Sequence, residues 1–421
     1  MKVFKFGGAS VNSASAVVNM AGIVEQYRSE PLVIVVSAMG KTTNNLELLL
    51  SEKTGAADDW QSTLSRLKDY HYEIIDNLFG ADVEDVRSKI DHFFRLLEEQ
   101  MQLASFDYNF NYDQIVSIGE LVSTTIISEY LNHIGISNCW LDVRTIIKTD
   151  STYREGKVEW EMTQSLANKY LQPMIDSCGI VVTQGFIAGS LQGATTTLGR
   201  EGSDYSAAIL SYCLSAEAMI IWKDVPGFLN ADPKYFANTK KINTIPYNEA
   251  IELAYYGASI IHPKTVKPLQ NKEIPLHVKS FVTPQSEGSV IRNADSIDPE
   301  TPLYIFKNNQ VLLSIMPKDF SFIAEDNLQK IFGQFAKMGV KVNMIQNSAL
   351  SFSVCMDNKD VVFDRLIPVL QKDFHVRYNN NLQLITIRYY TNEIINSIVG
   401  ERKIYLEQHS RVTAQLLVSE Q

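Results

Sequence analysis

A run of five apolar residues, Leu32–Val36, constrains the fold of this chain more than any other segment. The run is short, rich in β-branched residues and bounded by Pro31 and Ser37. A short strand that is apolar on both faces is typical of the centre of a parallel sheet covered by helices on both sides. The run therefore predicts an α/β architecture.

The segments around this run alternate between strand and helix patterns. The helices are predicted from about residue 13 to 28, 57 to 103 and 113 to 133. Further strands are predicted at Val3–Phe6, Cys139–Val143, Gly179–Thr183 and Ala218–Trp222. This alternation predicts an α/β sheet that binds its ligands at the carboxyl ends of its strands.

The pattern changes near residues 283–302, where proline, glycine and polar residues cluster, and we expect a linker there. The elements predicted beyond it are Val311–Met316, Asn327–Lys337, Val342–Gln346, Ser351–Met356, Val361–Leu370, Val376–Tyr378 and Leu384–Arg388. Their strand and helix patterns follow a β-α-β-β-α-β order, which is ferredoxin-like. Residues 393–418 add one helix and two strands.

The segment Thr195–Ala208 carries the strongest chemical signal. Five of the chain's 21 glycines lie between Gly185 and Gly202, and a loop with hydroxyls, Arg200 and Asp204 turns directly into a helix. The free N–H groups and the dipole of a helix N-terminus favour an anion, and an arginine binds a carboxylate through two parallel hydrogen bonds. Taken alone, the segment is read more simply as a glycine-rich surface turn with an aspartate N-cap.

Two glycines follow the first predicted strand in Lys5-Phe6-Gly7-Gly8. They let backbone amides approach a phosphate, and the lysine supplies a positive charge, although a Gly-Gly pair is also typical of a tight turn. Gly40-Lys41-Thr42 resembles the end of a P-loop, but the glycine that a P-loop needs five residues earlier is Val35. This excludes a P-loop and leaves a loop of small residues that can bind a substrate through Ser37 and Thr43.

Other polar residues lie near predicted helices and strand ends. Glu120 lies beside the apolar face of the 113–133 helix, where it can pair with a substrate ammonium or form an ion pair on the helix surface. Lys223-Asp224 and Pro226-Gly227 follow a predicted strand, as expected for a turn and compatible with a nucleotide site. The sequence contains no Ser-His-Asp spacing and no G-x-G-x-x-G motif, so hydrolase and dehydrogenase functions lack support.

Taken together, these segments resemble the aspartokinases, amino-acid kinases with C-terminal ACT domains, over nearly the whole chain. Lys5-Phe6-Gly7-Gly8-Ala9-Ser10 resembles the family's opening K-F-G-G-T-S. The other matching segments follow in the family's order: Val35-Val36-Ser37-Ala38, Gly119-Glu120, Thr195–Ala208, Asp224-Val225-Pro226-Gly227, and Tyr256-Gly257-Ala258 before His262-Pro263. The resemblance implies a catalytic three-layer sandwich with a mostly parallel sheet in residues 1–290. It also implies two ACT-like domains in residues 303–421, the second of them shortened.

The resemblance also implies an activity: transfer of the γ-phosphoryl group of ATP to the side-chain carboxylate of L-aspartate, the first step toward lysine, threonine and methionine. Lys5 and Asp204 would be catalytic, with Asp204 orienting Lys5. The substrate would contact Ser37, Thr43, Glu120, Arg200, Gly202 and Ser203, with Arg200 on the α-carboxylate and Glu120 on the α-ammonium. ATP, with the Mg²⁺ that it carries, would contact Lys5, Gly7, Gly8, Ser10, Lys223, Asp224, Lys234 and Ser259. We expect no metal held by the protein alone.

Some positions depart from the family pattern. Relatives commonly carry lysine where Ser259 stands, with Lys264 as a substitute in this chain, and an aromatic residue where Leu229 stands. The segment Val342–Ser348 resembles an effector loop, so Asn343, Asn347 and Ser348 are candidates for binding an amino-acid effector, lysine or threonine. Lysine-sensitive relatives carry aspartate at the position of Asn343. ACT domains usually pair, so we expect a homodimer.

Composition excludes several other classes of protein. A net charge of −10 argues against nucleic-acid binding, which needs a basic surface, and no apolar run approaches the length of a membrane span. The four cysteines show no metal-ligand spacing, so we expect no zinc site, no disulfide framework, and buried reduced thiols in the cytoplasm.

Two alternative functions stay open. One is another kinase of the same fold, such as an N-acetylglutamate kinase. The other is a non-catalytic ACT-type amino-acid sensor that retains the kinase fold. Glu120 and Arg200 favour a free amino acid as substrate, and the presence of Lys5 with Asp204 favours catalysis.

Overall fold

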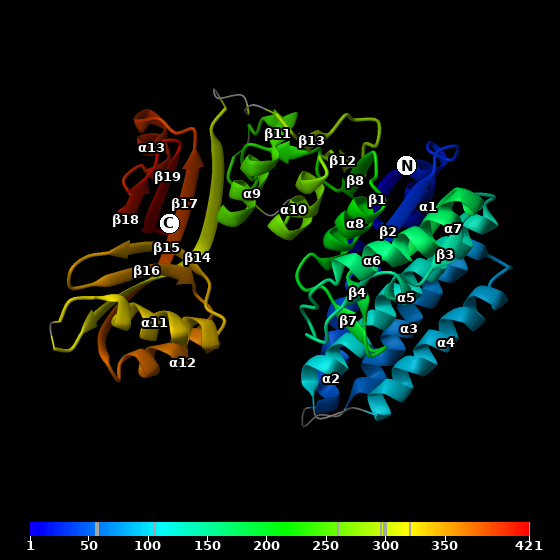
Figure 1. Cartoon of the computed structure of the whole chain (residues 1–421), viewed down its shortest axis with the longest axis horizontal. Helices are drawn as coiled ribbons and strands as arrows, with labels where there is room; N and C mark the ends of the chain where they lie inside the picture. The colour runs from blue at the N-terminus through cyan, green and yellow to red at the C-terminus, as the bar shows by residue number, and fades with distance from the viewer. Residues whose placement is uncertain are drawn as a thin grey trace. The chain divides into compact units, whose positions relative to one another are not determined.

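The computed structural model describes residues 1–54, 59–103, 107–236, 238–258, 261–294, 297, 301–319 and 321–420. The chain, drawn in Figure 1, forms two compact units. Unit 1 comprises Met1–Leu229, Lys241–Ala254 and Ser259–Ile297, and unit 2 comprises Asn230–Lys240, Tyr255–Ala258 and Asp298–Gln421. Two short segments that precede residue 283 in the sequence therefore belong to unit 2.

The central sheet of unit 1 has eight strands in the order β11-β13-β12-β8-β1-β2-β5-β3. Every neighbouring pair is parallel except β12 and β13, which confirms the predicted mostly parallel sheet. The strands are β1 (Lys2–Phe6), β2 (Leu32–Val36), β3 (Cys139–Leu141), β5 (Ile180–Gln184), β8 (Ala218–Lys223), β11 (Thr244–Pro246), β12 (Leu276–Ser280) and β13 (Ser289–Arg292). All five residues of β2 are buried, as its two apolar faces require.

Helices cover both faces of this sheet, with α8 and α10 on one side of the strands and α3, α4 and α5 on the other (Figure 1). The helices of unit 1 are α1 (Ala14–Glu25), α2 (Thr42–Thr54), α3 (Trp60–Phe79), α4 (Glu84–Gln102), α5 (Tyr108–His133), α6 (Trp160–Leu166), α7 (Gln172–Cys178), α8 (Gly202–Cys213), α9 (Tyr247–Tyr256, whose last two residues belong to unit 2) and α10 (Pro263–Asn271). The predicted helical region 57–103 is two helices. Helix α5 begins five residues before the predicted start, because the Asp107 carboxylate accepts the N–H groups of Asn109 and Phe110.

A smaller sheet lies beside the central one and carries part of the pocket described below. Its strands are β4 (Lys148–Thr149), β6 (Ile187–Ser190) and β7 (Thr195–Thr197), in the order β4-β6-β7. A separate hairpin pairs β9 (Phe228–Leu229) with β10 (Lys241–Ile242). Short turns of helix occur at η1 (Gly8–Val11), η2 (Val143–Thr145) and η3 (Ala167–Leu171).

The expected linker at 283–302 is partly wrong. Strand β13 lies inside it and pairs with β12 and β11, so this part of the segment completes the central sheet of unit 1. The strand is short, and its polar and glycine-rich flanks conceal it in the sequence.

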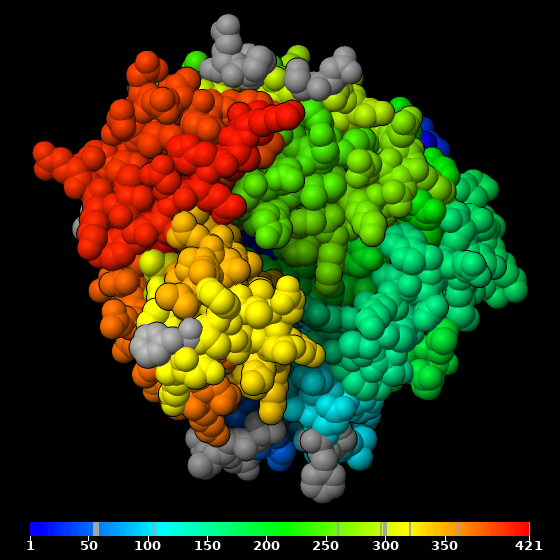
Figure 2. Space-filling model, turned by 60° about the vertical axis from the view of Figure 1, so that its left-hand side comes forward, coloured from blue at the N-terminus to red at the C-terminus, as the bar shows by residue number. Residues whose placement is uncertain are grey.

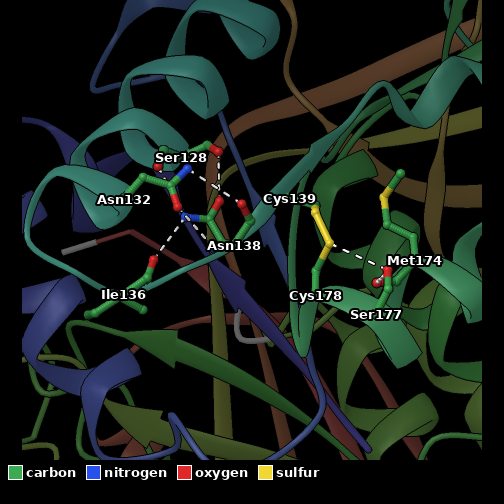
Figure 3. The surroundings of a disulfide bond; sticks show 8 residues. All are labelled: Ser128, Asn132, Ile136, Asn138, Cys139, Met174, Ser177 and Cys178. Atoms are coloured by element: carbon green, nitrogen blue, oxygen red, sulfur yellow. Dashed lines mark hydrogen bonds between the residues drawn. A yellow bond between two sulfur atoms is a disulfide. The ribbon is translucent and has the colours of Figure 1, made fainter.

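The prediction of reduced cysteines is wrong for two of the four. Cys139 at the start of β3 and Cys178 at the end of α7 form a disulfide with a Cα–Cα separation of 6.0 Å (Figure 3). The residue before β3, Asn138, bonds to the Ser128 carbonyl and so ties the strand to α5. Helix α7 leads into β5, which pairs with β3, so the two cysteines meet although 39 residues separate them. Cys213 and Cys355 are free and buried.

Unit 2 is built on one six-stranded sheet in the order β15-β16-β14-β17-β19-β18. Its elements are β14 (Leu303–Pro317), α11 (Glu325–Lys337), β15 (Val342–Asn347), β16 (Phe352–Asp357), α12 (Asp360–Leu370), β17 (Phe374–Arg388), α13 (Asn392–Val399), β18 (Ile404–His409) and β19 (Thr413–Ser419). In Figure 2 the half that carries α11 and the red half with β18 and β19 form one continuous surface. The order β14-α11-β15-β16-α12-β17 confirms the predicted ferredoxin-like pattern.

The two long strands β14 and β17 run through both halves of unit 2. The two predicted strands at 376–378 and 384–388 are one strand, because β17 pairs with β14 along nearly its whole length, with register shifts near Gln310. One apolar core packs α11 and α12 on the first half of the sheet, and another packs α13 on the second half. Among the residues that the structure describes, no helix has the length and apolarity needed to cross a membrane.

Candidate active site

A cavity of about 660 Å³ lies in unit 1, at the carboxyl ends of β1, β2 and β8 and at the N-terminus of α8. This is where an open α/β sheet binds its ligands. Its lining residues are Lys5, Gly8, Ser37, Ala38, Gly40, Thr43, Tyr112, Glu120, Arg154, Glu155, Phe186, Thr197, Gly199, Arg200, Glu201, Gly202, Ser203, Asp204 and Lys223.

An acid between two lysines forms one end of the pocket. Lys5 Nζ lies 2.6 Å from Asp204 Oδ1, and Lys223 Nζ lies 3.5 Å from Asp204 Oδ2. Burial alone would raise the pKa of Asp204, but the two lysines outweigh it and hold the pKa below its ordinary value. Asp204 is therefore ionised and fixes Lys5, which lines the cavity.

Close backbone packing explains the glycine at position 8. A Cβ on Gly8 would lie 2.6 Å from the Ala38 carbonyl oxygen and 3.0 Å from that of Gly40. The Gly40 N–H also donates to the Gly8 carbonyl at 3.0 Å. The loops after β1 and β2 therefore touch through their backbones, and no larger residue fits between them.

Glu120 enters the pocket from α5 and is almost fully buried. Its helix approaches α2 closely, since a Cβ on Gly119 would lie 2.8 Å from the Thr42 side chain. The Oε2 atom of Glu120 has no hydrogen-bond partner among the described residues. Burial raises the pKa of Glu120 well above its ordinary value, against the opposing effects of the Ala38 backbone and Lys5. A buried carboxylate with an unused oxygen is suited to a cationic ligand.

The N-terminus of α8 forms another wall of the pocket. Ser203 packs tightly against Gly185, where a Cβ would lie only 2.5 Å from the Ser203 Cβ. Glu201, which precedes the helix, has a left-handed backbone with φ of 55°. Its Oε2 atom is buried and has no hydrogen-bond partner in the described part of the chain. Burial, with Asp204 adding to it, raises the pKa of Glu201. Arg200 is exposed beside this turn.

Most of the predicted site residues meet in this cavity. Those that line it are Lys5, Gly8, Ser37, Thr43, Glu120, Arg200, Gly202, Ser203, Asp204 and Lys223. Gly7 is not among the lining residues but lies next to Lys5, because a Cβ on Gly7 would be 3.4 Å from Lys5 Nζ. Ser10 is buried, and its hydroxyl lies 3.5 Å from the Trp222 carbonyl oxygen.

The remaining predicted nucleotide contacts do not line the cavity. Asp224 is exposed just after β8, Lys234 is an exposed residue of unit 2, and Ser259 lies outside the described residues. Lys264, the suggested substitute for Ser259, lines a different groove of about 720 Å³ together with Lys157 and Lys267.

The predicted effector residues lie in unit 2 around β15. Asn343 Oδ1 accepts from Lys307 Nζ at 2.8 Å, and its Nδ2 donates to Gln310 Oε1 and to Asp357 Oδ1, both at 2.8 Å. Asn347 and Ser348 are exposed, and the Ser348 hydroxyl is 2.7 Å from that of Ser351. The side chain of Asn343 is thus already satisfied by its neighbours.

Sequence reasoning missed several lining residues, including Tyr112, Arg154, Phe186 and Glu201. Arg154, Phe186 and Glu201 share a left-handed backbone, with φ between 55° and 71°. Residue types other than glycine and asparagine rarely indicate this conformation, so it could not be predicted at these three positions. Among the described residues, no group of three or more His, Cys, Asp or Glu side chains could hold a metal ion.

Comparison with known proteins gives concordant results. Residues 1–280 match the amino acid kinase family. The chain is 32% identical over 362 residues to lysine-sensitive aspartokinase 3 of Escherichia coli, covering 84% of this chain and 78% of that relative. It is 32% identical over 372 residues to chloroplastic aspartokinase 1 of Arabidopsis thaliana, covering 84% of this chain and 63% of the plant protein, so it spans less than two thirds of that relative's length.

Solved structures agree with these relatives. The structure of E. coli aspartokinase III with aspartate and ADP (R-state) superimposes with a TM-score of 0.85 at 27% identity, covering 100% of this chain and 96% of that one. The complex of the same enzyme with lysine and aspartate (T-state) gives a TM-score of 0.84 at the same identity and coverage.

Proposed function

We propose how the pocket around Lys5 and Glu120 serves the reaction of this chain, which belongs to the amino acid kinase family and is an aspartate kinase. The reaction transfers the γ-phosphoryl group of ATP to the side-chain carboxylate of L-aspartate and gives 4-phospho-L-aspartate and ADP. The observation that carries the proposal is a buried carboxylate with an unused oxygen, Glu120, in the same cavity as Arg200 and the Lys5–Asp204 pair.

The amino acid would be held at its two charged α-substituents. Its ammonium would pair with Glu120, which compensates the cost of burying that carboxylate. Its α-carboxylate would bind Arg200 through two parallel hydrogen bonds, with Ser37, Thr43 and Ser203 lining the space between. The side-chain carboxylate then faces Lys5.

Phosphoryl transfer would need positioning and charge neutralisation but no base, because the nucleophile is already a carboxylate. A carboxylate oxygen bonds to the γ-phosphorus while the bond from that phosphorus to the β,γ-bridging oxygen breaks, and ADP leaves. Lys5, fixed by Asp204, would stabilise the oxygens of the group in transfer. The backbone of Gly7 and Gly8 would approach the same oxygens.

ATP would bind with its phosphates near Lys5 and Lys223, and Asp224, Lys234, Ser10 and Ser259 are proposed to border it. Mg²⁺ usually binds through one or two carboxylates together with substrate phosphates. Glu201, whose Oε2 has no partner among the residues that the structure describes, and neighbouring Asp204 fit that requirement and would hold the ion that the nucleotide carries. Mg²⁺ there would neutralise phosphate charge.

Regulation and assembly are further parts of the proposal. The relative from E. coli is named lysine-sensitive, and one of its structures contains lysine. We propose that an amino acid, lysine or threonine, regulates this chain near Asn343, Asn347 and Ser348, and that the chain forms a homodimer through its ACT domains. A cytoplasmic location stays a prediction.

Trapping the product with hydroxylamine tests the activity. Purified protein with Mg-ATP, L-aspartate and hydroxylamine should give aspartyl hydroxamate, and the Lys5→Ala variant should give almost none. N-acetylglutamate in place of aspartate tests the other amino-acid kinase activity. No hydroxamate above the Lys5→Ala background would favour the non-catalytic sensor.

A further inference from the structure

Arg154 is an unusual residue in the wall of this cavity, and nothing in the aspartate kinase reaction as described above uses it. It follows β4 in a loop that reaches the cavity, and its backbone has a φ of 68°. This left-handed region is unfavourable for a residue with a long side chain. Strain of this kind persists where the surrounding structure enforces it, and it often marks a functional position.

The enforcing contact is a buried carboxylate. Asp113 of α5 is fully buried, and its Oδ2 accepts the backbone N–H groups of Arg154 and Thr197, each at 2.9 Å. Its Oδ1 accepts the Thr197 hydroxyl at 2.8 Å. The Gly156 N–H also donates to the Thr197 carbonyl at 2.8 Å. The loop is therefore anchored to β7, directly before Gly199 and Arg200, while the side chain of Arg154 stays outside this network.

The guanidinium of Arg154 lies at the rim of the cavity. Its central carbon is 4.2 Å from the centroid of the Tyr112 ring, and Nη2 is 3.5 Å from Glu47 Oε1. The side chains of Arg154 and Glu47 are 41% and 46% exposed, so this ion pair is a weak surface interaction. An anionic ligand in the cavity can compete for the guanidinium at little cost.

Arg154 and Arg200 both line the cavity, and the chain segments that carry them are in contact. A Cβ on Gly199, the residue directly before Arg200, would lie 3.2 Å from the Arg154 carbonyl oxygen. The loop anchored by Asp113 therefore places Arg154 beside the turn that carries Arg200.

We infer that Arg154 is a second binding residue for the α-carboxylate of the amino-acid substrate, which it holds together with Arg200. Two guanidinium groups for the α-carboxylate and Lys5 for the side-chain carboxylate match a substrate with two carboxylates and select against amino acids with one. This inference rests on the proposed function, because it takes L-aspartate as the occupant of the cavity. Asp113 acts as a positioning residue that presents Arg154 and Thr197 to the substrate.

The backbone conformation supplies a clean test, because glycine and asparagine tolerate a positive φ. Arg154→Gly and Arg154→Asn remove the guanidinium without adding strain, so neither should lower the melting temperature. Titration calorimetry with L-aspartate should then give a Kd about 10- to 100-fold higher than for the unaltered protein, as expected for losing a charged hydrogen-bonding partner. Arg154→Lys, which keeps the charge but not the fork, should bind with an intermediate Kd.

Substrate analogues separate this role from a structural one. L-Aspartate with its α-carboxylate converted to an amide should bind the unaltered protein much more weakly than L-aspartate, and Arg154→Gly should reduce that difference. The KM for ATP should not change. A Kd for L-aspartate unchanged in both Arg154→Gly and Arg154→Asn would overturn the inference. Failure of the unaltered protein to form aspartyl hydroxamate would instead overturn the proposed function.

Discussion

The cavity of unit 1 and the cluster around Asn343 in unit 2 are built from similar side chains but differ in how fully these are satisfied. In the cavity, Glu120 and Glu201 each keep a buried oxygen without a partner among the described residues. Around Asn343, the amide oxygen and nitrogen are both engaged, by Lys307, Gln310 and Asp357. Because an unsatisfied buried polar group costs free energy, the first arrangement gains from a ligand and the second already has its own.

The contrast extends to the charges. Burial raises the pKa of Glu120 well above its ordinary value. Burial would also raise the pKa of Asp357, but hydrogen bonds from Gln310 and Asn343 and the charge of Lys307 lower it instead. The charge of Lys307 and these hydrogen bonds thus outweigh the burial of Asp357, whereas the charge of Lys5 does not outweigh the burial of Glu120. Glu120 can therefore bind the cation of a ligand, whereas Asp357 is already stabilised by Lys307 of the protein itself.

The largest effect is expected at the end of the cavity where the charges are already paired. Lys5→Ala removes the cation that Asp204 holds in place, so kcat should fall by about 10²-fold or more. Lys2→Ala, on the same strand but ion-paired with Glu30 away from the cavity, is the matched control and should leave kcat unchanged. Steady-state kinetics of aspartyl hydroxamate formation measure both. Equal losses in the two variants would contradict a role for Lys5 in the transition state.

Arg200 tests the substrate end of the same cavity. Arg200→Ala should raise the KM for aspartate by about 10- to 100-fold, as expected for losing a charged hydrogen-bonding partner, and leave the KM for ATP nearly unchanged. Arg95→Ala removes an exposed guanidinium on α4 and serves as the control. An equal rise in both KM values of Arg200→Ala would show that the arginine does not act on the amino acid specifically.

The cluster in unit 2 should respond in the opposite direction. An effector ammonium near Asn343 has to displace Lys307 Nζ, which is 2.8 Å from Asn343 Oδ1. Lys307→Met removes the competitor and should lower the concentration of L-lysine that half-inhibits the enzyme, by several-fold. Lys372→Met changes an exposed lysine of the same unit and should have no effect. Unchanged or weaker inhibition of Lys307→Met would show that Lys307 does not compete with the effector.

Much of the cavity could be predicted because its main residues lie in short segments at strand and helix ends. Lys5 and Lys223 lie near the carboxyl ends of two paired parallel strands, so the fold class alone brings them together with the N-terminus of α8. Arg154 and Tyr112 could not be found in this way. Their place depends on Asp113 bonding to Thr197 across 84 residues and on a left-handed backbone at an arginine. The Cys139–Cys178 disulfide likewise depends on a distant pairing, that of β3 with β5.

The hydrogen bonds that satisfy the side chain of Asn343 could not be predicted from the sequence either. Asparagine in place of the aspartate of lysine-sensitive relatives was visible, but its partners Lys307, Gln310 and Asp357 come from β14 and β16. Only the antiparallel pairing of these strands brings them together. Local sequence patterns locate polar residues, whereas the long-range register decides whether they remain available to a ligand.

The central claim is that Glu120 binds the ammonium group of the substrate. The number of protons released when aspartate binds tests this claim. With a raised pKa, the Glu120 carboxyl of the free protein binds a proton at pH values where an ordinary glutamate has lost it. A substrate ammonium favours the ionised form and lowers that pKa, so binding should release a proton. Affinity for aspartate should accordingly weaken as pH falls.

The measurement is titration calorimetry of L-aspartate in two buffers of different ionisation enthalpy, below the raised pKa of Glu120. We predict release of up to one proton by the unaltered protein, and none, with binding at least 10-fold weaker, by Glu120→Gln, which keeps the shape but not the charge. Binding without proton release in the unaltered protein, or equal affinity in Glu120→Gln, would contradict the claim.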